Sequence, residues 1–145
     1  MGSFRQFEDM FVWKEARTLA SEVHALTMRK PFSEDWGLRN QIERAAVSIS
    51  SNLAEGFERG SDKAFVSFLN IARGSVAEVR SQLYLAQDFG YISQEECDSA
   101  HRRCRTIASA ISKLIAYLSE KDRDAAVVRE DGVFYDIEEK LTYHA

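Results

Sequence analysis

Three arginines fall within the five residues HRRCR, which span 101–105. Arg102, Arg103 and Arg105 would lie within two turns of a helix, where clustered guanidinium groups can bind phosphate oxygens. Arg39, Arg44, Arg73 or Arg80 could join them if the fold brings them near. The alternative is a solvated face whose arginines pair with acidic side chains, because the net charge of the whole chain is −4. The sequence leaves both interpretations open, and a nucleic-acid site is one of them.

Cys97, His101 and Cys104 share one side of the same stretch and suggest a metal site. Seven residues of helix place the two cysteines about 10.5 Å apart, however, which exceeds the reach of a disulfide and is awkward for two zinc ligands. Only one of the two cysteines could bind the same metal ion as His101. We therefore expect these thiols in the core of the fold, and we predict neither a metal nor another cofactor.

A serine-rich run within AAVSISSNLAEGFERGS, residues 45–61, raises the question of a catalytic nucleophile. A nucleophilic serine needs an adjacent base, and none of the three histidines, His24, His101 and His144, stands near the run in the sequence. The chain also has no P-loop, no H-E-x-x-H and no Glu-x-x-His pair of the kind that holds a metal inside a helical bundle. The sequence therefore predicts a protein without enzymatic activity.

Four amphipathic stretches must position these residues, since apolar side chains recur every three or four positions along most of the chain. The pattern predicts helices over about 12–30, 34–59, 62–89 and 94–121. Ser33 and Ser61 are expected to cap the second and third helices, and Ser93 with Glu96 forms a capping box before the fourth. Short breaks make neighbouring helices antiparallel, so we predict an all-α, up-down-up-down four-helix bundle.

The bundle is expected to occupy residues 1–122 as one domain, followed by an acidic C-terminal extension over residues 123–145. Residues 1–122 carry 16 basic and 17 acidic side chains, whereas the extension carries 3 basic and 6 acidic ones. The extension is apolar enough that we expect it to dock on its own bundle or on an adjacent subunit.

No stretch approaches the roughly 18 apolar residues of a membrane span, and the N-terminus lacks a signal-peptide core, so we expect a cytoplasmic protein with no membrane partner.

Small residues are predicted to bring the second and third helices close together. If the chain folds back about Gly60, residues whose numbers sum to about 120 face each other. This rule gives three facing pairs: Ser48 with Ala72, Ala46 with Gly74, and Ala45 with Ser75. Side chains this short let two helix axes approach to the lower end of the usual range of about 8–10 Å. The serine-rich run is therefore expected to be a packing surface.

The third predicted helix carries more apolar residues than one buried stripe requires. Phe68, Ile71 and Leu85 fall on a second line, and Tyr84 adds a further apolar surface. A helix of an isolated four-helix bundle should have a polar outer side. We therefore expect these four residues in a subunit interface, the alternative being an extended core.

Four segments of the chain resemble a known family. They are FEDMFVWKEA (7–16), WGLRNQIERAAVSISSNLAEGFERGS (36–61), FLNIARGSVAEVRSQLYLA (68–86) and GYI (90–92). In order and spacing they resemble the four-helix-bundle proteins encoded within intervening sequences of bacterial 23S ribosomal RNA genes, a family that is similar to the accessory proteins of diversity-generating retroelements. The resemblance implies a ring-shaped homopentamer of bundles with a capacity to bind nucleic acid, and it brings no catalytic residues.

Three positions depart from the pattern of this family. Ser50 stands where the family commonly has proline, so an expected kink in the second helix is removed. Glu43 replaces a frequent arginine, which weakens the basic surface on which RNA binding would depend. Arg80 stands where an acidic residue is usual.

These observations together predict a homopentameric interaction module with RNA or a nucleoprotein as its partner. The alternative is a protein–protein assembly scaffold with no nucleic-acid role. Nothing in the sequence identifies a small-molecule substrate.

Overall fold

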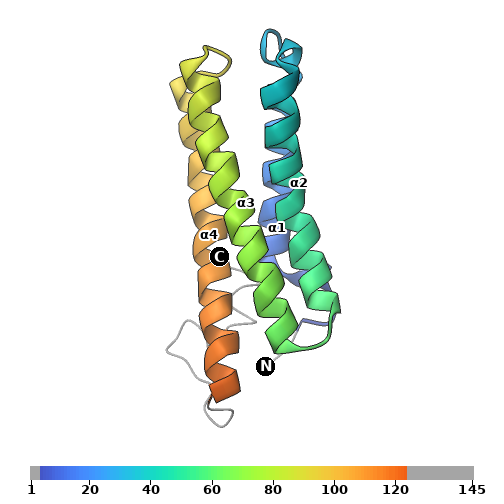
Figure 1. Cartoon of the computed structure of the whole chain (residues 1–145). Coiled ribbons are helices and arrows are strands. Elements are labelled where there is room, and N and C mark those ends of the chain that lie inside the picture. The colour runs from blue at the N-terminus through green and yellow to red at the C-terminus, as the bar shows by residue number, and fades with distance from the viewer. Residues whose placement is uncertain (1–3, 124–145) are drawn as a thin grey trace.

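The computed structural model describes residues 4–123, which form four long helices and two short helical turns (Figure 1). In chain order the elements are η1 (Phe7–Asp9), α1 (Phe11–Thr27), η2 (Phe32–Glu34), α2 (Trp36–Glu58), α3 (Asp62–Asp88) and α4 (Gln94–Arg123). The all-α prediction is confirmed. The predicted docking of the C-terminal extension falls on residues 124–145, outside the described part of the chain.

The four helices form an antiparallel bundle in which each helix packs against its neighbours in the sequence. Contacts join α1 to α2, α2 to α3 and α3 to α4, and α1 also packs on α4 and closes the bundle. Figure 1 shows the pairs α1–α2 and α3–α4 side by side, with all four axes running nearly along the same direction. The predicted four-helix bundle is therefore confirmed. Within residues 4–123, no helix combines the length and the apolar composition needed to cross a membrane.

The helix ends follow the predicted caps at two of three places. Ser61 Oγ accepts a hydrogen bond from Ala64 N at 3.1 Å. Before α4, Ser93 Oγ accepts from Glu96 N at 3.1 Å while Glu96 Oε1 accepts from Ser93 N at 2.9 Å, which completes the capping box. The expected breaks at Gly60 and Gly90 have positive φ values of 85° and 81°, a conformation that glycine adopts without strain.

The predicted cap at Ser33 is wrong, because the turn η2 delays the start of α2. Asp35 caps α2 instead, and its Oδ1 accepts from Leu38 N at 3.1 Å. The other oxygen of Asp35 accepts from the Tyr91 hydroxyl at 2.7 Å, and the Tyr91 ring stacks on Phe32 at 5.0 Å between centroids. One aspartate thus ties the α1–α2 connection to the α3–α4 connection.

The facing pairs of α2 and α3 are shifted by about one turn from the predicted ones. Ser48 Oγ lies 2.9 Å from Ser75 Oγ, and Gln82 Nε2 donates to Gln41 Oε1 at 3.3 Å, so the residue numbers sum to 123 in both pairs. Side chains of a helix lean toward its N-terminus and cover a spot about one position before their own Cα. In antiparallel helices the two displacements add, so the hydrogen-bonded partner of Ser48 is Ser75, three positions beyond the predicted Ala72.

The predicted contact between Ala46 and Gly74 is also wrong. Ala46 is buried in the core, but Gly74 is exposed, with nothing within 4 Å of the place where a Cβ would stand. The close approach occurs at Gly56, where a Cβ would lie 2.6 Å from Phe68 Cβ. Small residues do bring α2 and α3 together, but near the α2–α3 turn and through a different glycine.

Candidate functional site

Helix α3 presents two outward faces of different chemistry. Its inner side is apolar and buried: Leu69, Ala72, Val76, Val79, Leu83 and Ala86. With about 100° between successive residues, Ile71, Glu78 and Leu85 fall on the side toward α2. Arg73, Arg80 and Tyr84 fall on the opposite side, toward α4. One helix therefore separates an apolar, acidic face from a basic, aromatic one.

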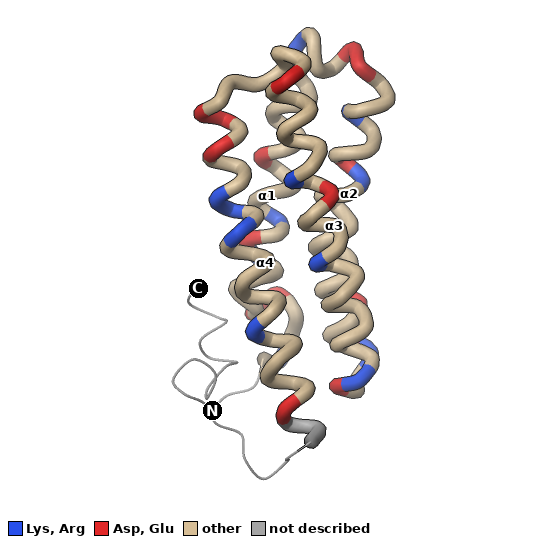
Figure 2. Tube along the Cα trace, turned by 60° about the vertical axis from the view of Figure 1, so that its left-hand side comes forward, with Lys and Arg blue, Asp and Glu red and all other residues tan. Residues whose placement is uncertain are grey.

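The basic side of α3 continues onto α4. Arg73 reaches across to α4, where its Nη1 donates to Ser112 Oγ at 3.1 Å, and its Nη2 donates to Asn70 Oδ1 at 2.8 Å. Arg102 and Arg105 are exposed on α4. We call the set Arg73, Arg80, Arg102 and Arg105 the α3–α4 arginine face. None of the four forms an ion pair with a carboxylate in the described part of the chain, and Figure 2 shows basic positions along both helices.

A buried histidine lies beneath this arginine face. His101 is 3% exposed, and the ring of Tyr84 covers it at 4.3 Å between centroids while remaining 53% exposed itself. Burial lowers the pKa of His101, and the positive charges of Arg80 and Arg105 lower it further. Both ring nitrogens of His101 and Nε of Arg80 lack hydrogen-bond partners among the described residues. The face therefore has an uncharged, buried imidazole below it and guanidinium groups without carboxylate partners in the described residues above it.

Arg103 belongs to a different part of the molecule. Its Nη1 donates to Glu15 Oε1 at 2.6 Å and its Nε to Glu22 Oε1 at 3.1 Å, so the half-buried guanidinium bridges two carboxylates of α1. Position 103 lies on the α1 side of α4, roughly 160° around the helix from position 105. The ion-paired alternative therefore describes Arg103, which lies apart from the α3–α4 arginine face.

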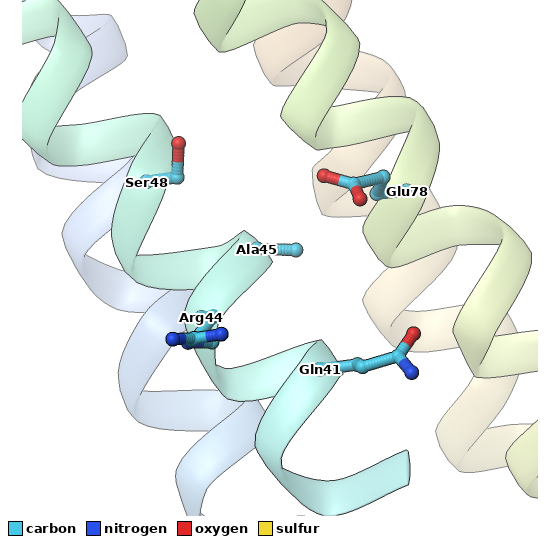
Figure 3. Close-up of a pocket in the computed structure, with 5 residues that line it drawn as sticks. All are labelled: Gln41, Arg44, Ala45, Ser48 and Glu78. Atoms are coloured by element: carbon cyan, nitrogen blue, oxygen red, sulfur yellow. The ribbon is translucent and has the colours of Figure 1, made fainter. Parts of the chain in front are cut away.

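Arg44 does not join the arginine face either. It lies on α2, at the rim of a polar cavity between α2 and α3. The cavity has a volume of about 360 Å³ and is lined by Gln41, Arg44, Ala45, Ser48 and Glu78. Figure 3 shows Gln41 and Ala45 pointing from α2 toward α3, and Glu78 pointing back toward α2. Three separate sites therefore hold Arg44, Arg103 and the group of Arg73, Arg102 and Arg105.

The four residues expected in a subunit interface also separate. Ile71 and Leu85 are 52% and 41% exposed on the α2 side of α3. Phe68 is half-buried against Gly56, with the guanidinium of Arg59 4.9 Å from its ring centroid. Tyr84 lies on the other side, over His101. Only Ile71 and Leu85 share one exposed apolar line.

The cysteines lie in the core of the bundle, as the sequence predicts. Cys97 and Cys104 are 1% and 0% exposed, and both are free thiols. Burial raises the pKa of Cys97, and it raises the pKa of Cys104 to about 12, which keeps that thiol protonated and unreactive. No group of three potential metal ligands from His, Cys, Asp and Glu occurs among the described residues.

Sequence reasoning named Arg80 as a possible neighbour of the arginine cluster, but it missed the position of Tyr84 and His101 beside it and the cavity at Glu78. The sequence did contain a signal for the position of Tyr84. Arg73 and Arg80 stand seven residues apart and Tyr84 follows four residues later, so all three fall on the same side of a helix. The cavity depends on the register of α2 against α3, which no local pattern determines.

The chain matches the family model described as 23S rRNA-intervening sequence protein over residues 8–113. The match covers α1, α2, α3 and two thirds of α4, and it therefore includes every residue of the α3–α4 arginine face. A comparison with curated proteins found no match. The fold, the helix order and this match together show that the chain belongs to the 23S rRNA-intervening sequence protein family.

Proposed function

We propose that this chain is a non-enzymatic, cytoplasmic, homopentameric interaction module whose α3–α4 arginine face binds RNA through its phosphates. The observation that carries the proposal is that Arg73, Arg80, Arg102 and Arg105 gather on one face with no carboxylate partner in the described residues. Guanidinium groups bind phosphate oxygens in a bidentate manner, and such contacts position a nucleic acid without reading its bases.

Assembly would let a chain of net charge −4 bind RNA. A homopentamer presents the same four arginines five times around one axis, so weak contacts add through the high effective concentration of the neighbouring faces. The acidic residues of α1 do not counteract this, because Glu15 and Glu22 are already paired with Arg103.

A titration of a fluorescein-labelled RNA hairpin tests the proposal. The full chain should bind weakly at about 50 mM salt and lose affinity by about 200 mM, because each neutralised phosphate contributes a log–log slope near −0.7 to −0.9. The double variant Arg102→Glu with Arg105→Glu should weaken binding at least about tenfold at the lower salt concentration. Both side chains are exposed, so the bundle should fold as before.

A matched control is Lys14→Glu with Arg17→Glu, which makes the same change in net charge on exposed positions of α1. This control should bind nearly as well as the parent if the site is on α3 and α4. If the parent does not bind RNA at the lower salt concentration, or if both double variants bind equally well, RNA binding at this face is refuted. The protein–protein assembly scaffold is then the better interpretation.

A further inference from the structure

We propose that the cavity between α2 and α3 is a binding site for a small zwitterion of the α-amino-acid class. The site is separate from the arginine face, because it lies on the opposite side of α3. It consists of Gln41, Arg44, Ala45, Ser48 and Glu78, and its volume of about 360 Å³ lies at the lower end of ligand-binding pockets.

The cavity is an empty position in an otherwise regular contact between two helices. On one side of it, Gln82 Nε2 donates to Gln41 Oε1 at 3.3 Å. On the other side, Ser48 Oγ lies 2.9 Å from Ser75 Oγ. The same register places Ala45 opposite Glu78, but the alanine methyl group is too short to fill the space (Figure 3). Hydrogen-bonded pairs above and below hold the helices, so the cavity exists before a ligand binds.

The polar groups of the cavity select the ligand. Arg44 and Glu78 line it from opposite helices, and neither has an ion pair or a side-chain hydrogen bond among the described residues. A ligand with only one charge would leave one of these groups unpaired beside it, whereas a zwitterion offers a carboxylate to Arg44 and an ammonium group to Glu78. The Gln41 amide and the Ser48 hydroxyl add hydrogen-bonding capacity, and Ala45 forms the floor.

The proposal can be tested by comparing glycine with two molecules that each carry only one of its charged groups. Acetate carries only the carboxylate of glycine, and methylammonium carries only its ammonium group. The full chain, labelled at its alanine methyl groups, is titrated with glycine, with L-serine and with each half-ligand while the methyl signal of Ala45 is followed by NMR. Ala16, which is 0% exposed in the core, provides the control signal. Methyl signals are observable in large assemblies, so oligomerisation does not prevent the measurement.

We expect glycine and L-serine to shift the Ala45 signal with dissociation constants of about 1–10 mM, given their few non-hydrogen atoms. Each half-ligand should bind at least about tenfold more weakly, since it pairs only one of the two charges. Glu78→Gln and Arg44→Gln should each abolish the response, whereas Glu58→Gln, an exposed position near the end of α2, should leave it unchanged.

The charge-swapped variant Arg44→Glu with Glu78→Arg sharpens the test, because it retains one charge of each sign and should still bind glycine in the reverse orientation. Binding of acetate or methylammonium as tightly as glycine would overturn the zwitterion proposal. So would an Ala45 signal that does not move with either amino acid, or one that moves together with the signal of Ala16.

Discussion

Two helical glycines on neighbouring helices have opposite surroundings, and this difference predicts opposite effects of the same substitution. A Cβ at Gly56 would lie 2.6 Å from Phe68 Cβ and 3.1 Å from Phe65 Cδ1, whereas nothing lies within 4 Å of a Cβ at Gly74. Gly56→Ala should destabilise the fold by about 1–2 kcal/mol, because overpacking exceeds the gain in helix propensity. Gly74→Ala should stabilise it by about 0.5–1 kcal/mol.

Urea denaturation, monitored by circular dichroism, measures the change in the free energy of unfolding for both variants. The two variants control for each other, since the chemical change is identical and both sites are inside helices. A Gly56→Ala variant as stable as Gly74→Ala would show that α2 and α3 do not approach closely at that point.

The partners of individual surface arginines were the feature least predictable from the sequence. Arg102, Arg103 and Arg105 fall within four residues of sequence, yet only Arg103 of the three turns toward α1, where it pairs with carboxylates 81 and 88 residues earlier in the chain. Whether a surface arginine is paired depends on side chains of another helix, and neither their distance nor their direction is encoded locally. Stripes of buried residues were predictable because every third or fourth position must be apolar.

The start of helix α4 is stabilised by a charged cap. The Arg29 guanidinium donates to both Glu96 oxygens, at 2.7 and 2.8 Å, and Ser93 N donates to Oε1. These bonds lower the pKa of Glu96 from 4.5 to about 2. Because the folded pKa lies below the unfolded one, the carboxylate stabilises the fold fully above about pH 4.5, and this stabilisation is lost as the pH falls through 2.

Glu96→Gln should therefore cost about 0.5–1 kcal/mol at pH 7, a modest value because the ion pair is partly exposed and Gln retains part of the cap. The difference from the parent should shrink as the pH falls from 4.5 toward 2, which urea denaturation at several pH values would reveal. Glu95→Gln is the matched control, since Glu95 is exposed at the same helix end and forms no ion pair among residues 4–123. If the difference in the free energy of unfolding between Glu96→Gln and the parent stays constant from pH 4.5 to pH 2, the charge of Glu96 does not stabilise the fold as assigned.

The elements themselves were largely predictable, since glycines, serine caps and apolar periodicity define α3 and α4 almost to the residue. The start of α2 was not predictable, because Ser33 and Asp35 are both good capping residues, and only the structure shows that Ser33 lies inside η2 and that Asp35 also accepts a hydrogen bond from Tyr91. The two faces of α3 could be assigned to α2 and α4 only after the order of the helices around the bundle was known.

We expect the subunits of an assembly to meet at the exposed apolar residues Ile71 and Leu85 of α3. If they form the interface of a homopentamer, the double variant Ile71→Glu with Leu85→Glu would bury unpaired charges and should dissociate the assembly. Light scattering should then give a mass near 16.5 kDa in place of five times that value, with the helical content unchanged. Met28→Glu with Phe89→Glu, two other exposed apolar positions, is the matched control and should remain assembled. A parent chain that is itself monomeric would refute the assembly.

The charge of the whole molecule leads to a last prediction, which concerns RNA affinity. Residues 124–145 carry two basic and six acidic side chains, so ending the chain after Arg123, the last residue of α4, changes the net charge from −4 to 0. RNA binding at low salt should then strengthen by about twofold to tenfold, and the gain should fade at high salt as charges are screened. Replacing the six acidic residues by their amides in the full-length chain separates charge from other effects of truncation: Asp124, Glu130, Asp131, Asp136, Glu138 and Glu139. If the amide variant binds RNA as the truncated chain does, repulsion by these carboxylates is the cause. If truncation strengthens binding and the amide variant does not, the charge argument fails.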